Sequence, residues 1–388
     1  MAIASQTEYH EDIRTAPTDP ARAEAYLPAA TVQSHASNLL LLDDGDLLCS
    51  WFGGSQEGCA DISIYLSRLR PGSPRWEAPK RISDDPHRSE QNPVLFAVPG
   101  SREIWVVYTA QEAGHQNRAV VRKRVSGDRG ATWSPATQLF AERGAFVRQP
   151  LVVLGDGTWV LPMWYCRAPE GFQWTGSDDV SAVRYSRDRG ETWEEQAVPE
   201  SAGCVHMNVR RAPDGSFVAF FRSRWADRVY RSTSADCIHW APPRAIGLPN
   251  PNSGICVDVL PSGKLAMVFN NSSATPDMRR REGLYDDITP EAEKLKNQPA
   301  VNGKEAIWGT PRSALSFGVS EDLGETWKFK TIEDTDGYCM TNNSKDKINR
   351  EASYPSIATG QGGWIHIAYT YFRQRIKYVR VKEDYAVA

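Results

Sequence analysis

Apolar runs separated by short turns recur along the whole chain. In SNLLLLDDGDLLCSWF and QPLVVLGDGTWVLPMWY, for example, two such runs flank an Asp-Gly turn. Runs of about four to eight residues bounded by Gly, Asp or Pro are typical of β-strands, and two runs around a tight turn predict a hairpin. We count six predicted hairpins along the sequence.

A third run follows each hairpin, as in ISIYLS and ALSFGVS, and in three units it leads into one shared phrase. This phrase, S-x-D-x-G-x-T-W, occupies residues 126–133, 186–193 and 320–327, and degenerate copies occupy 67–76 and 232–240. Its Asp can accept hydrogen bonds from the amides of a tight turn, and its Gly can adopt a positive φ. Its Trp can pack on the strands. Repetition at this spacing indicates a repeat architecture.

Four predicted strands in each of six repeats indicate an all-β fold, a six-bladed β-propeller of four-stranded antiparallel blades with these turns. The last unit ends after its third strand, so residues 10–34 are predicted to supply the strand that closes the ring. Residues 275–311 are predicted to form an insertion in the fifth blade. We expect residues 1–388 to form a single domain, because propellers of this length fold as one unit.

Composition and charge narrow the classes of partner. A net charge of −3 with interleaved signs and no basic stripe argues against nucleic-acid binding. No run approaches the ~18 apolar residues of a membrane span, and no apolar signal segment is visible. The seven cysteines show no CxxC or metal-like spacing. We expect a cytoplasmic protein without metal, cofactor or membrane partner that holds a small carbohydrate or other small molecule in a central pocket.

Polar residues gather where the first strands begin and the second strands end. In a propeller these positions share the rim opposite the Asp turns, where loops surround the central pocket. The predicted site residues on this rim are His35, Glu57, Asn92, Arg148, His206, Asn208, Arg222, Asn252, Arg312, Glu351, Tyr354 and Tyr369.

The repeated phrase and these rim residues resemble the sialidase superfamily, six-bladed propellers of the BNR or Asp-box type. Phrases such as HASNLLLLDDGDLLCSWFGG and TPRSALSFGVSED resemble the group of predicted neuraminidases within it. The resemblance implies three arginines that bind the substrate carboxylate, a tyrosine nucleophile with a glutamate partner, and an acidic proton donor. Arg222 matches the second arginine and Arg312 the third. Tyr354 matches the nucleophile, and Glu57 falls where the acid/base residue belongs.

Two positions depart from that pattern. His35 stands where the first arginine is expected, and the glutamate expected at the start of blade 4 is replaced by CVHMNVRR, which offers His206 and Asn208. A tyrosine with a pKa of about 10 is a weak nucleophile without a carboxylate base. Glu351 is a candidate partner for Tyr354, although strict strand alternation places two residues with an odd offset on opposite faces.

The sequence therefore favours a sialidase-like glycoside hydrolase that removes a terminal acidic sugar. In this mechanism Glu57 protonates the leaving oxygen while Tyr354 or water attacks the anomeric carbon. An alternative is a lyase, in which the arginines neutralise a uronate and a His or Tyr removes the α-proton for β-elimination. A third class remains open: a non-catalytic glycan-binding propeller, or a biosynthetic enzyme on the same fold.

Overall fold

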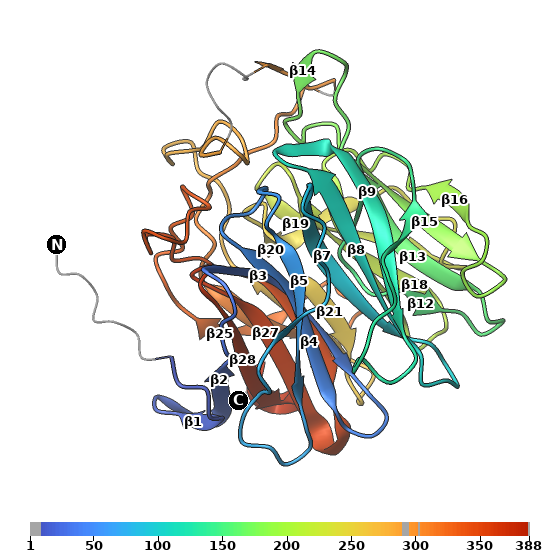
Figure 1. Ribbon diagram of the computed structural model, residues 1–388, viewed down its shortest axis with the longest axis vertical. Helices are drawn as coiled ribbons and strands as arrows, with labels where there is room; N and C mark the ends of the chain where they lie inside the picture. Colours follow the sequence, from blue (N-terminus) through green and yellow to red (C-terminus); the bar gives the residue numbers. More distant parts are fainter. Residues whose placement is uncertain (1–8, 289–294, 302, 387–388) are drawn as a thin grey trace.

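Six antiparallel sheets surround a common axis in the computed structural model, which describes residues 9–288, 295–301 and 303–386 (Figure 1). The fold is the predicted six-bladed propeller. Blade 1 comprises β3 (Gln33–Leu41), β4 (Leu47–Gly54), β5 (Ser63–Leu69) and β6 (Lys80–Arg81). Blade 2 comprises β7 (Arg88–Ala97), β8 (Ile104–Glu112), β9 (His115–Ser126) and β10 (Thr137–Phe140). Blade 3 comprises β11 (Ala145–Val147), β12 (Val152–Val153), β13 (Trp159–Tyr165), β15 (Val180–Ser186) and β16 (Glu194–Ala197).

The remaining blades follow the same order. Blade 4 comprises β17 (Cys204–Arg211), β18 (Phe217–Ser223), β19 (Arg228–Ser234) and β20 (Arg244–Pro249). Blade 5 comprises β21 (Cys256–Val259), β22 (Leu265–Asn270), β24 (Leu315–Ser320) and β25 (Lys328–Glu333). Blade 6 includes β26 (Ala352–Thr359), β27 (Trp364–Tyr371) and β28 (Arg375–Lys382). Two short 3₁₀ helices, η2 (Gln361–Gly363) and η3 (Glu383–Ala386), flank strands of the sixth blade.

The sixth blade takes its outer strands from the other end of the chain. β2 (Asp19–Tyr26) pairs antiparallel with β28, so that Ala23 lies opposite Arg380 and Tyr26 opposite Lys377. β1 (Arg14–Ala16) then pairs with β2 at the edge. The ring is thus closed by strands from two distant parts of the sequence.

The core consists of layers between neighbouring blades. Between blades 1 and 2, Phe52 and Ile64 pack with Leu95 and Val106. Each blade is covered on both faces, so its inner strands bury successive residues and need not alternate with polar ones. This explains the nearly continuous apolar runs in the sequence.

The Asp-box turns form the hydrogen bonds expected from their sequence. The carboxylate of Asp322 accepts bonds from the amides of Glu325 (3.1 Å) and Thr326 (2.9 Å) and from the Ser320 hydroxyl (2.8 Å). Gly324 has φ +87°, and a Cβ there would overlap the ring of Phe220 in the preceding blade. The glycine therefore serves inter-blade packing as well as the turn.

An insertion separates β22 from β24 on the rim opposite the Asp-box turns. Its strand β23 (Lys296–Asn297) pairs in parallel with β14 (Phe172–Gln173), which belongs to the β13–β15 connection of blade 3 (Figure 1). The insertion thus reaches across the rim from blade 5 to blade 3.

Candidate active site

A β-bulge near the start of the first strand recurs in four blades. The register shifts within β3, β7, β17 and β26, and at these places Ala36, Asn92, His206 and Tyr354 adopt positive φ values between 51° and 60°. A bulge redirects a side chain away from the regular alternation of the strand. These bulges present His206 and Tyr354 to a common centre, where their rings lie 5.5 Å apart.

Buried arginines surround the Tyr354 ring. The guanidinium carbons of Arg148, Arg222 and Arg312 lie 5.6, 5.4 and 5.4 Å from its centroid. Arg222 donates a hydrogen bond from Nη1 to the Tyr354 hydroxyl and another from Nε to Asn252 Oδ1 at 2.7 Å. Arg222 also has like-charged neighbours, and burial together with these lowers its pKa to about 9. A nearby anion stabilises the charged form of such a buried guanidinium.

Arg148 has a different set of partners. Its Nη2 donates to the backbone carbonyls of Ser37 (2.8 Å), Tyr354 (3.3 Å) and Pro355 (3.3 Å). It therefore supports the backbone of the Tyr354 bulge from the inner side. Burial lowers the pKa of Arg148.

Arg373 was not predicted from the sequence, yet it lies in the same cluster. It belongs to the β27–β28 turn, and its guanidinium bridges two carboxylates: Nε donates to Glu351 at 2.9 Å and Nη1 to Glu57 at 2.5 Å. Glu351 also lies 3.4 Å from Arg312. Burial raises the pKa of Glu351, but Arg373 and Arg312 outweigh it and hold that pKa below its usual value.

Two histidines flank Tyr354. The His35 ring is 4.3 Å from the Tyr354 ring, and its Nδ1 lies 2.9 Å from the Thr370 hydroxyl and 3.7 Å from Glu351. His206 Nε2 is 3.4 Å from Arg222 Nη1. Burial and the surrounding arginines lower the pKa of both histidines well below 6.5, so both rings are neutral. His35 Nε2 and His206 Nδ1 are buried without a hydrogen-bond partner in the part of the chain that the structure describes.

The cluster carries an excess of positive charge. Arg148, Arg222, Arg312 and Arg373 face only two carboxylates in the ion pairs of the described residues, Glu57 and Glu351. Both carboxylates bond to Arg373 or Arg312, which leaves Arg222 and Arg148 without an acidic partner. Buried cations are stable when paired, so the arrangement favours an anionic ligand beside Tyr354.

Described parts of the insertion cover this cluster. The Tyr285 hydroxyl accepts hydrogen bonds from Gln111 (2.9 Å) and Gln116 (3.0 Å) of blade 2. The Trp308 ring centroid lies 5.9 Å from the guanidinium carbon of Arg222. The insertion thus contacts the rim on both sides of the arginine cluster.

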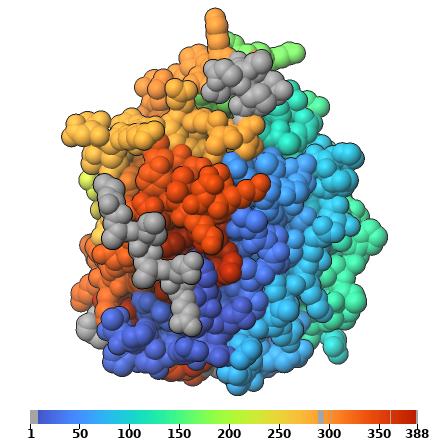
Figure 2. All heavy atoms as spheres, turned by 60° about the vertical axis from the view of Figure 1, so that its left-hand side comes forward, coloured from blue at the N-terminus to red at the C-terminus, as the bar shows by residue number. Residues whose placement is uncertain are grey.

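The loop between β25 and β26 joins the same cover. Asp287 of the insertion accepts hydrogen bonds from the Thr341 hydroxyl and the Asn342 amide, both at 2.8 Å, and pairs with Arg281 at 2.8 Å. Figure 2 shows the two segments, gold and orange, lying against each other on one side of the molecule. Together they leave the site residues almost fully buried.

The sequence profile of the family described as BNR repeat-like domain matches residues 45–367. The chain belongs to this family. No curated protein of similar sequence was found. Among solved structures, the Hadza microbial sialidase Hz136 is similar with a TM-score of 0.67 at 14% identity, over 93% of this chain and 69% of that one.

Two further structures resemble this BNR-repeat protein. A protein of unknown function from Dyadobacter fermentans has a TM-score of 0.66 at 12% identity, over 94% of this chain and 99% of that one. The NanB sialidase from Streptococcus pneumoniae has a TM-score of 0.63 at 11% identity, over 93% of this chain and 70% of that one. At these identities the likeness shows that the BNR-repeat protein shares the propeller fold of sialidases.

Several predicted site residues lie outside the central contacts. The Tyr369 hydroxyl donates to Glu333 at 2.7 Å, and its ring belongs to the core between blades 5 and 6, so it does not face the arginine cluster. Asn208 donates to Gln149, which in turn donates to the Ile255 carbonyl at 2.8 Å. These two side chains connect blades 3, 4 and 5.

The remaining predicted residues occupy the rim as follows. Asn252 touches both Arg222 and Arg312, since its carbonyl accepts from Arg312 Nη2 at 3.1 Å. Asn92 is buried, and its Oδ1 has no hydrogen-bond partner among the described residues. Glu57 contacts Arg373, so in this structure its carboxylate accepts a hydrogen bond from a guanidinium.

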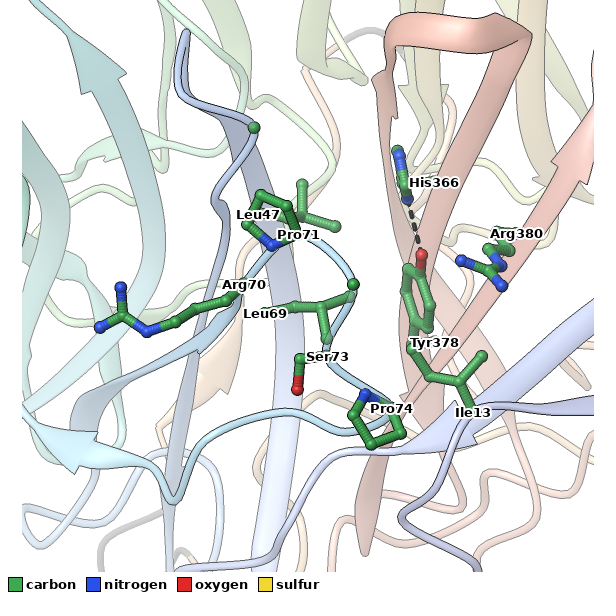
Figure 3. A pocket seen from close by; sticks show the side chains of 12 residues that line it. Ile13, Leu47, Leu69, Arg70, Pro71, Ser73, Pro74, His366, Tyr378 and Arg380 are labelled. Atoms are coloured by element: carbon green, nitrogen blue, oxygen red, sulfur yellow. Dashed lines mark hydrogen bonds between the residues drawn. The ribbon is translucent and has the colours of Figure 1, made fainter.

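A separate cavity of about 280 Å³ lies between blades 1 and 6 (Figure 3). His366 and the Tyr378 hydroxyl are hydrogen-bonded there at 2.6 Å, beside Arg380 and Arg70. None of the residues around Tyr354 lines it. It is therefore distinct from the candidate active site.

Residues 9–288, 295–301 and 303–386 contain no cluster of three His, Cys, Asp or Glu side chains suited to a metal ion. The same residues include no helix with the length and apolarity needed to cross a membrane.

Proposed function

We propose that this BNR-repeat protein is a sialidase-like glycoside hydrolase that removes a terminal acidic sugar. The observation that carries the proposal is the Tyr354 hydroxyl, which accepts a hydrogen bond from Arg222 within a buried cluster of excess positive charge. Two of the similar solved structures are sialidases, which supports the same class of reaction.

The carboxylate of the sugar binds to the arginines. Arg222 and Arg312 lie on two sides of Tyr354, and Arg222 has no acidic partner among the described ion pairs. Charge-assisted hydrogen bonds from guanidinium to carboxylate are short and directional. Arg373 is the third arginine, in place of the one that His35 replaces in the sequence pattern. The sugar carboxylate competes with Glu57 for Arg373 Nη1.

The bond changes then follow from the positions of Tyr354 and Glu57. Tyr354 Oη forms a bond to the anomeric carbon as the glycosidic bond breaks, and Glu57 donates a proton to the leaving oxygen. Arg222 donates a hydrogen bond to the Tyr354 oxygen and stabilises the negative charge that develops there in the transition state. Burial and the nearby arginines lower the pKa of His206, the sugar carboxylate offsets the charge of the arginines, and the ring of His206 takes up the phenol proton. Water then cleaves the tyrosyl–sugar bond: Glu57 takes a proton from the water, and the released Tyr354 oxygen recovers its proton from His206.

The test is product analysis with a matched pair of tyrosine variants. The protein is incubated with sialyl and glucuronyl 4-methylumbelliferyl glycosides and with rhamnosyl-glucuronate, and products are identified by mass spectrometry. A product with one added water is expected, and Tyr354→Phe should lower kcat on the order of 10³-fold or more. Tyr369→Phe is the control, because it removes a buried hydroxyl outside the cluster. Equal rates in the two variants would remove Tyr354 from the mechanism.

A second candidate reaction is β-elimination from a uronate. It is favoured by one observation: Tyr354 is surrounded by arginines and two neutral histidines, and no described carboxylate bonds to its hydroxyl. Arginines that neutralise a uronate carboxylate make its α-proton more acidic, and a neutral imidazole or phenolate can remove that proton. The same assay separates the two reactions, since elimination gives an unsaturated product that absorbs in the ultraviolet and gains no water.

A further inference from the structure

A groove of about 970 Å³ lies between blades 2 and 3, below the described part of the insertion. Its aromatic residues are Phe172, Trp174 and Tyr285. Its volume is at the upper end of the ~300–1,000 Å³ typical of ligand sites and exceeds what one sugar needs.

The groove lies next to the candidate active site. The Trp174 indole donates to Asp179 at 2.8 Å, and the carboxylate of Asp179 pairs with Arg224 at 2.7 Å. Trp174 also lies 5.6 Å from Trp308, which in turn lies over Arg222. One layer of aromatic side chains therefore separates the groove from the arginine that contacts Tyr354.

Exposed cations line the outer part of the groove. Arg143 and Arg167 are exposed and have no ion pair in the described structure, whereas Arg118 pairs with Glu112 at 3.1 Å. The acidic lining residues are Glu170 and Asp178, and Asp178 accepts hydrogen bonds from Gln298 and from a backbone amide. The lining thus combines the partly exposed ring of Phe172 with two exposed guanidinium groups, while Trp174 and Tyr285 are buried beneath it.

We propose that this groove binds the sugar residues that follow the terminal one in an acidic glycan. This inference rests on the proposed function, because the terminal sugar occupies the site beside Tyr354. Aromatic rings offer flat apolar faces to sugar rings, and exposed arginines bind carboxylates with directional hydrogen bonds. The protein therefore prefers an acidic oligosaccharide to a single acidic sugar.

The test compares long and short ligands in two double variants. Arg143→Ala/Arg167→Ala removes the unpaired cations of the groove. Arg102→Ala/Arg211→Ala removes two exposed arginines beside the turns between first and second strands, on the other rim. All proteins carry Tyr354→Phe so that ligands are not consumed. Binding of the α2,8-linked sialic acid tetramer, tetragalacturonate and their monosaccharides is measured by calorimetry.

The groove variant should bind at least one tetrasaccharide about 10-fold more weakly, as expected for two lost charge-assisted contacts, with monosaccharide affinity changed less than about 2-fold. The control variant should match the parent. Equal losses for long and short ligands, no loss, or no tetrasaccharide binding to the parent would overturn the groove assignment. Groove-dependent binding without turnover of any glycoside by the Tyr354 protein would reject the hydrolase and retain the groove. Turnover of a tetrasaccharide by the Tyr354 protein that Arg143→Ala/Arg167→Ala leaves unchanged would retain the hydrolase and reject the groove.

Discussion

The ion pair between Arg373 and Glu57 offers a quantitative test of the buried cluster. The two side chains are 2% and 7% exposed and meet at 2.5 Å, and Arg373 also bonds Glu351. Arg373→Met removes a cation that serves two buried carboxylates. Glu351 keeps its contacts with Arg312 and Ser353, but Glu57 loses its ion-pair partner. Breaking a buried pair in this way costs about 3–5 kcal/mol.

That cost translates into a measurable shift in melting temperature. With an unfolding entropy of roughly 2.1 cal/mol/K per residue, a chain of 388 residues loses about 4–6 °C in Tm. Glu57→Gln keeps the size of the side chain and a hydrogen bond to Arg373, so we expect its unfolding free energy to fall by only about 1–2 kcal/mol. In the double variant neither charge remains unpaired at this contact. Its loss of unfolding free energy should therefore be about 2 kcal/mol smaller than the sum of the two single-variant losses.

Differential scanning calorimetry of the four proteins measures this cycle. The matched control is the exposed pair of Arg187 and Glu194, each 61% exposed, for which the same substitutions should couple by less than about 1 kcal/mol. The reasoning is refuted if the Arg373 and Glu57 effects add within about 0.5 kcal/mol, or if Arg373→Met costs no more than Arg187→Met.

Two further predictions concern the frame around the site. Gly324→Ala should lower the unfolding free energy by about 2–4 kcal/mol, because the added carbon overlaps Phe220. The control Gly263→Ala should cost about 1 kcal/mol, since φ is +84° there too but the nearest atom is 3.5 Å from the added carbon. Equal Tm values for the two variants would contradict the packing role. Burial and Arg380 lower the pKa of His366 to about 4, so the neutral ring contributes stability above pH 6.5 that is lost as the pH falls toward 4. His366→Gln should therefore lose less Tm than the parent between pH 7 and pH 4.5, and identical losses would contradict the assignment.

The blade architecture was predictable because it rests on local signals. The Asp-box phrase specifies its own hydrogen bonds, as Asp322 shows, and its repetition marks successive blades. The alternation of apolar runs and turns supplies the rest of the pattern. These features depend on residues that are close in sequence, which is why the sequence alone indicates the six-bladed propeller.

The site was only partly predictable because backbone irregularities decide it. Strict alternation separates Glu351 from Tyr354, but the bulge at Tyr354, with φ 51°, brings both side chains to Arg312. Tyr369 was placed on the pocket rim because it lies near the end of a second strand, whereas its hydroxyl contacts Glu333. Arg373 was missed because it sits in a turn at φ 53°, where no periodicity indicates the direction of a side chain.

The closure of the ring by β2 and β28 has a consequence for biosynthesis. Tyr26 is made about 350 residues before its partner Lys377. At roughly 5–20 residues per second, β2 must wait about 20–70 s before it can pair. During that time the nascent chain exposes the edges of an open ring. A chain interrupted before β28 leaves β2 without this partner, so synthesis of β28 is a requirement for a sealed ring, and products truncated before it present free strand edges to chaperones and proteases.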